Sequence, residues 1–286
     1  MLAEILDYLK PQAGGHYIDC TLGGAGYTIA LAEIVGPTGK ILGIDLDELA
    51  INNARQKMAH QKLANIVLVN DNFKNLTTIA AQNLPGKADG IVFDLGLSSA
   101  QLDDETRGFS FKGERPLDMA FGHQNQRSTA DIVNNYDLLE LTEIFREYGE
   151  ERRAYQIAKA IVASRREKRL ETTADLLAVV EKAVPFRHYS KINPATKIFQ
   201  ALRMETNEEL NVLREVLPQA LSLLKSGGRL VVVSFHSGED RIVKRFLKDN
   251  PAVKVLTKRP QIAQEEEIVA NPRARSAKLR AAEKIR

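Results

Sequence analysis

A glycine-rich segment follows an aspartate close to the amino terminus. Asp19 precedes Gly23, Gly24 and Gly26, and a helical pattern begins directly after them. Glycines permit tight turns and close ligand approach, and the free amides of a helix N-terminus bind polar groups, so the segment predicts a nucleotide-like ligand. The dinucleotide fingerprint would place Gly or Ala at position 29, which is Ile29. A carboxylate also repels a pyrophosphate but attracts a sulfonium and an ammonium group, so S-adenosylmethionine is favoured over NAD, with a purely structural turn as the alternative.

A second carboxylate has the spacing expected of a ribose contact. Asp45 ends a predicted strand nineteen residues after Gly26, where a carboxylate can accept hydrogen bonds from both hydroxyls of an adenosine ribose. The alternative is a helix cap, although Asp47 can take that role. Phe73, after the next predicted strand, either packs on an adenine face or belongs to the core, and the core is the better interpretation.

A third carboxylate is the candidate for catalysis. Asp94 ends the fourth predicted strand, and Gln101 follows shortly afterwards. An exocyclic amine such as cytosine N4 is a poor nucleophile, and a carboxylate that accepts its N–H bonds would favour attack and help to remove the proton. An ordinary turn at Asp94 is the alternative. Cys20 is the only thiol and lies in the first loop, which makes methylation at a ring carbon through a cysteine nucleophile unlikely chemistry for this chain.

Positive charge concentrates in two segments, although the chain as a whole carries only +3. Residues 151–171 contain seven basic side chains against three acidic ones, and residues 271–286 contain six against one. Such clusters suit contacts to RNA phosphates, and a solvated helix face is the alternative. The five histidines lack metal-ligand spacing, so no metal site is expected.

The elements that must position these residues alternate between strand and helix. Strands are predicted at 16–21, 40–45, 66–70, 88–94 and 230–235, and helices at 27–35 and 48–58. Between the fourth and fifth strands lie a polar loop at 103–126 and a helical region at 130–184, with caps at Thr172–Asp175 and Asn193–Pro194. A further helix runs from Leu210 and is expected to end at 226–228, with Pro218 kinking or interrupting it. The pattern predicts an α/β, Rossmann-like doubly wound sheet, formed by residues 1–102 and 206–286, with a helical domain at 103–205 inserted into it.

Length and composition agree with a folded cytoplasmic protein. The 286 residues are 44% hydrophobic and 27% charged, which is close to the globular norm. A single cysteine cannot form an internal disulfide, and a reducing compartment is expected. No apolar run has the length of a membrane span, and the amino-terminal residues do not have the pattern of a signal peptide.

Taken together, several ordered blocks resemble the bacterial 16S rRNA (cytosine-N4)-methyltransferase family, over nearly the whole chain. The blocks are YIDCTLGGAG at 17–26, DLGLSSAQLD at 94–103, RGFSF at 107–111 with PLDM at 116–119, YGEER at 148–152, NPAT at 193–196 with FQALR at 199–203, SFHS at 234–237 with EDRIVK at 239–244, and NPRARS at 271–276. The chain departs from the family at Ala25–Gly26–Tyr27, where Gly-Gly-His is usual, and at Ala120, where Arg is usual.

The resemblance implies a methyltransferase that modifies N4 of a decoding-centre cytosine, with Asp94 as the catalytic residue. It places cofactor contacts on Ala25, Gly26, Tyr27, Asp45, Phe73, Asp94 and Gln101, and the glycine-rich segment adds Asp19 and Gly24 to the expected contacts. The expected substrate contacts are Arg107, Arg152, Arg203, His236, Arg273 and Arg275. The implied cofactor is S-adenosyl-L-methionine, and the implied partner is 16S rRNA or the small ribosomal subunit, with no membrane and no metal. A homodimer remains open. The alternatives are an RNA-binding ribosome-assembly factor that has lost catalysis, and an NAD-dependent oxidoreductase, which the incomplete glycine fingerprint disfavours.

Overall fold

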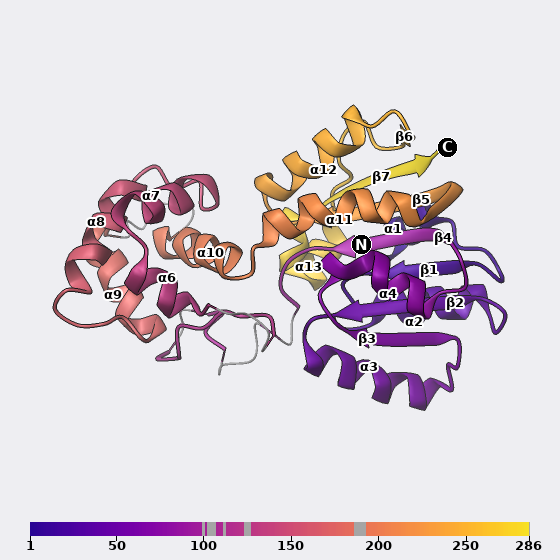
Figure 1. Cartoon of the computed structure of the whole chain (residues 1–286), viewed down its shortest axis with the longest axis horizontal. Helices are drawn as coiled ribbons and strands as arrows, with labels where there is room; N and C mark the ends of the chain where they lie inside the picture. Colours follow the sequence, from indigo (N-terminus) through magenta and orange to yellow (C-terminus); the bar gives the residue numbers. More distant parts are fainter. Residues whose placement is uncertain (99–100, 102–106, 111–112, 123–126, 186–192, 286) are drawn as a thin grey trace. The chain divides into compact units, whose positions relative to one another are not determined.

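The chain divides into two compact units. The computed structural model describes residues 1–98, 101, 107–110, 113–122, 127–185 and 193–285. Unit 1 comprises Met1–Ser98 and Leu210–Arg286, and unit 2 comprises Ser99–Glu209 (Figure 1). These limits lie four residues from the expected boundaries at 102/103 and 205/206.

Unit 1 is built on a sheet of seven strands. Its strands are β1 (His16–Asp19), β2 (Lys40–Asp45), β3 (Ile66–Asn70), β4 (Ala88–Asp94), β5 (Leu224–Ser234), β6 (Val253–Val255) and β7 (Lys278–Lys284), in the order β3-β2-β1-β4-β5-β7-β6. Strands β1 to β5 pair with one another in parallel, as the βα pattern predicted. Strand β7 runs antiparallel to both β5 and β6. Strands β6 and β7 were not predicted, and they distinguish this sheet from a dinucleotide-binding sheet of order 3-2-1-4-5-6.

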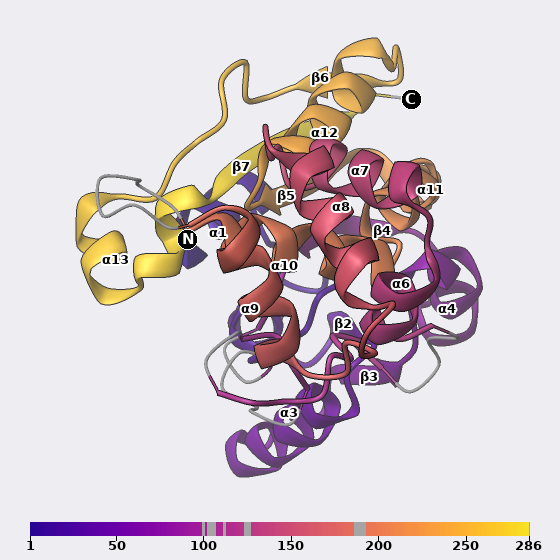
Figure 2. The same cartoon turned by 90° about the vertical axis from the view of Figure 1, so that its left-hand side faces the viewer.

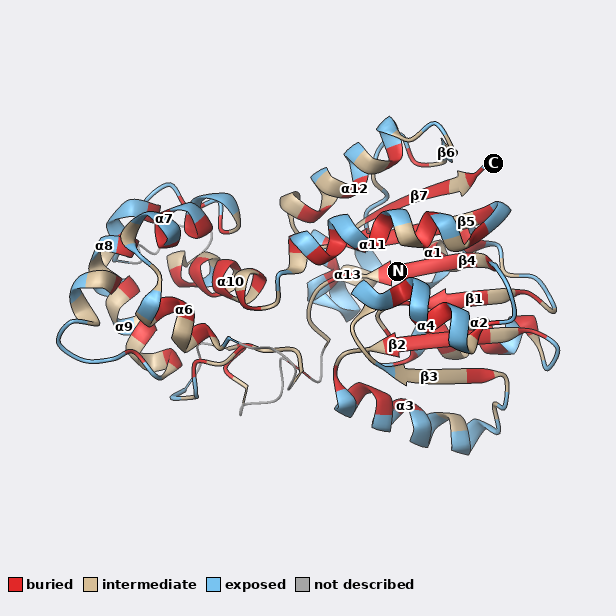
Figure 3. Cartoon of the chain, in the orientation of Figure 1, coloured by how far each residue is buried: buried red, intermediate tan, exposed pale blue. Residues whose placement is uncertain are grey.

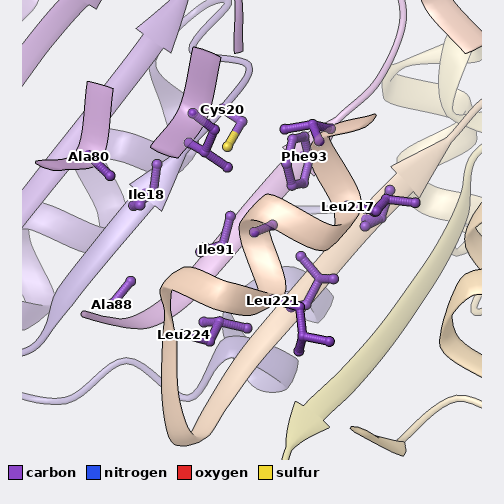
Figure 4. Packing of buried hydrophobic residues seen from close by; sticks show 14 of the residues in the cluster. Ile18, Cys20, Ala80, Ala88, Ile91, Phe93, Leu217, Leu221 and Leu224 are labelled. Carbon is purple, nitrogen blue, oxygen red and sulfur yellow. The ribbon is translucent and has the colours of Figure 1, made fainter. Parts of the chain in front are cut away.

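Helices cover both faces of the sheet. Neighbouring strand residues such as Ile18 and Tyr17 belong to two different core clusters, because side chains alternate between the faces of a strand. The cluster that contains Ile18 and Phe93 also includes residues of α4 (Leu76–Asn83), α11 (Glu209–Leu223) and α12 (Ser237–Asp249). Figure 4 shows the part of it contributed by the strands, α4 and α11. The cluster that contains Tyr17 includes residues of α1 (Leu2–Leu9) and α2 (Gly26–Val35). The sheet is therefore doubly wound, and its strands are largely buried (Figure 3).

The remaining described elements of unit 1 are one long helix and three short helical segments. They are α3 (Glu48–Gln61), the 3-10 turn η1 (Phe73–Asn75), α13 (Glu265–Ala270) and the 3-10 turn η2 (Pro272–Ser276). Asp47 caps α3 by accepting a hydrogen bond from the Leu49 amide, as predicted.

The expected end of α11 was wrong. The helix ends at Leu223, and residues 226–228 belong to the first part of β5. Leu224 pairs with Ala88 and Arg229 pairs with Gly90, so the extra residues of β5 form an irregularity at this point. Gly227 has a φ of +80°, which favours glycine and allows this bulge.

Pro218 does not interrupt α11. It lies inside the helix, although it provides no N–H for an intrahelical bond. Leu213, Leu217 and Leu221 are all buried on the core side. The free energy gained from this packing exceeds the cost of the lost hydrogen bond. The sequence pattern alone does not give the relative size of these two effects.

Lys284 stabilises the junction between α11 and β5 through hydrogen bonds. Its Nζ donates hydrogen bonds of 2.8 Å to the carbonyl oxygens of Leu221 and Leu224, and burial lowers its pKa. We expect Lys284→Met to reduce the free energy of unfolding by about 2 kcal/mol, because the two carbonyls lose a charged donor. Urea denaturation measures the change. The exposed Lys254→Met on the neighbouring strand is the control, with an expected change within about 0.5 kcal/mol, and equal effects of the two variants would contradict this role of Lys284.

Unit 2 is helical. It contains α6 (Thr129–Asn135), α7 (Leu138–Glu147), α8 (Ala154–Ser164), α9 (Thr173–Ala183) and α10 (Pro194–Thr206) (Figure 2). Thr172 and Asp175 form the predicted capping box, and Asn193 caps α10 with Pro194 in its first turn. The expected loop at 103–126 lies partly outside the described residues. Its described part contains an isolated bridge from Pro116 to Thr172.

None of the helices in the described parts of the chain combines the length and the apolar character that crossing a membrane requires.

Candidate active site

Three aspartates end parallel strands at the same edge of the sheet. Asp19 pairs in register with Gly43 of β2 and with Val92 of β4. Asp45 and Asp94 each lie two residues beyond those partners. The three carboxylates therefore occupy the carboxyl edge of β1, β2 and β4, which is where ligands bind in open α/β sheets.

The glycine-rich loop leaves room for a ligand. Gly24 and Gly26 are exposed, and a Cβ added to either would meet no atom within 4 Å. Neither has a positive φ, so neither the packing nor the backbone conformation requires glycine there. Glycine at both positions is what close approach of a cofactor to the backbone would require.

Ala25 stands between them in a conformation that favours glycine. It is the N-cap of α2, with a φ of +63°, and its side chain is fully buried beside Leu22 and Ile51. The left-handed backbone conformation destabilises an L-residue by roughly 1–2 kcal/mol, and burial of the alanine methyl group offsets part of this destabilisation.

We expect Gly26→Ala to separate cofactor binding from stability. Position 26 is the first residue of α2, where alanine is a better helix former than glycine by up to about 1 kcal/mol. The melting temperature without ligand should therefore stay equal or rise. The dissociation constant for the cofactor, measured by calorimetry, should increase about tenfold, which corresponds to about 1.4 kcal/mol. Unchanged affinity would show that the loop does not contact the cofactor.

Asp45 is held in place by backbone amides. Its Oδ2 accepts a hydrogen bond of 2.8 Å from the Gly23 amide, and its Oδ1 accepts one of 2.8 Å from the Asp47 amide. The capping role that was the alternative for Asp45 is filled by Asp47. The carboxylate is thus fixed between the end of β2 and the glycine-rich loop.

Asp19 is fully buried beneath the same loop. Thr28 donates from its hydroxyl to Oδ2 at 2.8 Å, and the Thr21 amide donates to Oδ1 at 3.2 Å. The pKa of Asp19 is raised to about 7, chiefly by burial; the hydrogen bonds from Thr28 and Thr21 oppose this shift, and the charges of Asp94 and Asp45 add to it. A cationic group nearby would favour the charged form, so the site suits a ligand that carries positive charge.

Asp94 presents one fixed oxygen and one without a partner. Its Oδ2 accepts a hydrogen bond of 2.9 Å from the Tyr27 hydroxyl, and its backbone amide donates to Thr21 Oγ1 at 2.6 Å. The Oδ1 atom is buried and has no hydrogen-bond partner among the described residues. A buried acceptor of this kind is costly unless a ligand or water supplies a donor.

Burial also places Asp94 close to the range of neutral pH. It raises the pKa of Asp94 to about 6, while the Tyr27 hydrogen bond lowers it. The charges of Glu239 and Glu267 also raise the pKa of Asp94, and the amino group of Met1 lowers it. The same burial, together with the Asp94 charge, raises the pKa of the Tyr27 hydroxyl, which therefore stays protonated as a donor.

Two hydroxyl residues of this site were not predicted. Thr21 and Thr28 bind the aspartates through Thr21 Oγ1 and Thr28 Oγ1. The only signal in the sequence is a hydroxyl residue on each side of the glycine cluster, nine positions from Asp19 in the case of Thr28.

Phe73 is half-buried in η1 beside the core. Its ring centre lies 5.7 Å from that of Phe93, and the ring planes are nearly perpendicular at 85°. This packing agrees with the core interpretation and leaves an adenine contact as a proposal. Gln101 is buried and belongs to unit 2.

Two of the expected RNA-contacting arginines are engaged within unit 2. Arg107 donates to the carbonyl oxygens of Ala120 and Phe121 at 2.9 and 2.6 Å. Arg203 forms a bidentate ion pair with Glu209 at 2.7 and 2.8 Å. Both side chains therefore organise the unit itself, and the charge of Arg203 is paired with that of Glu209.

The other expected substrate residues are placed differently. Arg152, Arg273 and Arg275 are exposed, the last two on η2. His236 is the N-cap of α12, where its Nδ1 accepts a hydrogen bond of 3.3 Å from the Glu239 amide.

Comparison with known proteins identifies the family. The family model described as the MraW methylase family matches residues 1–285. The chain belongs to the MraW methylase family. It is therefore an S-adenosylmethionine-dependent methyltransferase, and the predicted cofactor class and fold are confirmed.

The chain aligns with relatives over more than nine tenths of their length. The ribosomal RNA small subunit methyltransferase H of Thermomicrobium roseum is 44% identical, over 100% of this chain and 92% of the relative. The protein of the same name from Deinococcus deserti is 46% identical, over 99% and 91%. A crystal structure of an rRNA-methylase from Clostridium thermocellum has a TM-score of 0.51 at 17% identity, covering 99% of this chain and 97% of that one, which supports the fold.

Proposed function

We propose that this chain transfers the methyl group of S-adenosylmethionine to the exocyclic N4 of a cytosine in the decoding centre of 16S rRNA. The relatives of matching length are named as small-subunit rRNA methyltransferases. The observation that carries the choice of atom is Asp94, whose Oδ2 is held by Tyr27 while the buried Oδ1 lacks a partner among the described residues.

In this proposal each residue at the sheet edge binds a different part of the cofactor. Asp19 faces the cationic end of the cofactor, the loop from Gly24 to Tyr27 lies along it, and Asp45 accepts its ribose hydroxyls. Phe73 packs on the adenine, and Gln101 is a further cofactor contact in this proposal. When bound, S-adenosylmethionine supplies an electrophilic methyl group.

Asp94 acts on the amine. Its Oδ1 accepts an N4–H hydrogen bond, which orients the nitrogen and supports loss of its proton. Tyr27 keeps the other oxygen in place, because its hydroxyl donates to Oδ2.

For substrate RNA, we propose that unit 2 provides the recognition domain. In this proposal three exposed arginines contact RNA phosphates: Arg152 of unit 2, and Arg273 and Arg275 of unit 1. Arg107 and Arg203 contribute to RNA binding by stabilising the structure of unit 2. His236 contributes to RNA binding from the start of α12. In this proposal the protein acts in the cytoplasm, where ribosomes are assembled, and it needs no metal ion. Sedimentation tests whether it forms a homodimer.

The experiment is methyl transfer from labelled S-adenosylmethionine to small ribosomal subunits that lack the modification. Nucleoside mass spectrometry then locates the methyl group. Appearance of N4-methylcytidine would support the proposal. Subunit binding without methyl transfer would instead favour an assembly factor that has lost catalysis.

The pH dependence should report the contact between Tyr27 and Asp94. Asp94 acts in its charged form, so kcat/KM falls as the pH drops through its pKa of about 6. Tyr27→Phe removes the hydrogen bond that lowers this pKa, and the acid limb should therefore move to higher pH. We expect a several-fold loss at pH 6 and nearly full activity at pH 8. An equal loss at all pH values would contradict the role of the hydroxyl.

A further inference from the structure

The most basic stretch of unit 1 lies outside the two clusters that the sequence pattern singled out. Residues 241–260 contain seven basic side chains and one acidic side chain, Asp249. Their net charge is +6, whereas the whole chain carries +3, so the other 266 residues together carry −3. All seven basic side chains are exposed: Arg241, Lys244, Arg245, Lys248, Lys254, Lys258 and Arg259. We call them the α12–β6 basic surface.

Apart from the exposed Asp249 in its last turn, helix α12 separates its charges by sign. Four of the basic residues occupy positions i, i+3, i+4 and i+7 from Arg241, which form one face of a helix. The two acidic residues of its first turn are turned to the protein. Glu239 is buried in the capping box, and Asp240 forms an ion pair of 2.6 Å with Arg280.

The chain continues this positive face beyond the helix. Helix α12 packs against β6, which carries Lys254, and Lys258 and Arg259 follow in the next loop. Along α12, Arg241 and Lys248 are separated by about 10 Å at 1.5 Å per residue. A nucleic-acid strand presents about three phosphates over that length, at about 3.4 Å per phosphate.

The chemistry of the surface selects among partners. A membrane-surface helix exposes an apolar face, but the apolar residues Val243 and Leu247 of α12 are buried in the core. A protein interface is anchored by apolar or aromatic side chains, and Val255 is the only large hydrophobic residue of 241–260 that is exposed. An ordinary solvated surface carries both signs in similar numbers, whereas this stretch carries seven exposed basic side chains against one exposed acidic side chain, that of Asp249.

We infer that the α12–β6 basic surface binds the phosphate backbone of the substrate RNA, as a contact that unit 1 makes through its own helix. This inference rests on the proposed action on rRNA. It assigns part of the affinity for the ribosomal subunit to residues that lie on neither the inserted unit nor the 271–286 segment.

The test replaces three charges on α12 together, as Lys244→Gln, Arg245→Gln and Lys248→Gln. The probe is purified small ribosomal subunits that lack the modification, with binding measured over a series of salt concentrations. Affinity at about 150 mM salt should fall about 10- to 100-fold, and the slope of log affinity against log salt should decrease in magnitude by about 2. The melting temperature and the affinity for S-adenosylmethionine should not change.

A charge-matched control uses three exposed basic residues elsewhere in unit 1, as Arg55→Gln, Lys74→Gln and Arg214→Gln. This control should bind like the unmodified chain. A second variant, Lys244→Arg, Arg245→Lys and Lys248→Arg, keeps the charge and should keep the affinity.

Equal behaviour of the neutralised variant and the control would overturn the inference. It would leave the proposed function intact, provided that the unmodified chain still forms N4-methylcytidine. An unmodified chain that neither binds nor methylates the subunits would instead overturn the proposed function.

Discussion

Asp94→Asn should lower kcat for methyl transfer by about 100-fold or more, while the dissociation constant for S-adenosylmethionine stays within about threefold. The amide keeps the size of the side chain and an oxygen that can accept from Tyr27. It has lost the negative charge that supports deprotonation of an amine. Single-turnover kinetics and calorimetry separate the two quantities.

The matched control is Asp89→Asn, on the same strand. Asp89 accepts a hydrogen bond from the His16 amide and pairs with Lys225, well away from the carboxyl end of β4. Its activity should stay close to that of the unmodified chain. Full activity of Asp94→Asn would remove Asp94 from the mechanism and leave proton loss to water.

The second large effect concerns cofactor affinity. Asp45→Asn should raise the dissociation constant for S-adenosylmethionine about 100-fold, or about 2.8 kcal/mol. The new amide group cannot accept from both the Gly23 and Asp47 amides, and it offers a weaker acceptor to the ribose hydroxyls.

Asp47→Asn removes the same charge two residues further on. Asparagine caps helices as well as aspartate does, so α3 should be unaffected and the cofactor affinity unchanged. If the two variants weakened binding equally, general electrostatics and not a ribose contact would explain the effect of Asp45.

The sequence allowed the central strands and the acidic edge to be predicted for a clear reason. Strands buried on both faces are continuous apolar runs, as at residues 91–93, and the aspartates that end them mark the polar rim. Strand β7 gave no such signal. Its Arg280 and Lys284 are buried because Asp240 and two carbonyl oxygens satisfy them, and those partners are distant in sequence.

Side-chain contacts across the sheet were equally hidden. Tyr27 and Asp94 are 67 residues apart, and only the pairing of β1 with β4 brings their loops together. The sequence identified both residues as site candidates but gave Tyr27 no link to the catalytic carboxylate. The α12 charges were overlooked because acidic neighbours in the sequence mask a sign separation that only the folded helix reveals.

The placement of the inserted unit bears on how the chain folds. Strands β4 and β5 are neighbours in the sheet, yet Asp94 and Leu224 are 130 residues apart. Closing so long a loop costs conformational entropy, and contacts between distant residues slow folding. Early folding of unit 2 would shorten the effective loop before β5 arrives. We therefore expect the catalytic sheet to assemble after the helical unit has formed, at a rate that depends on how fast that unit forms.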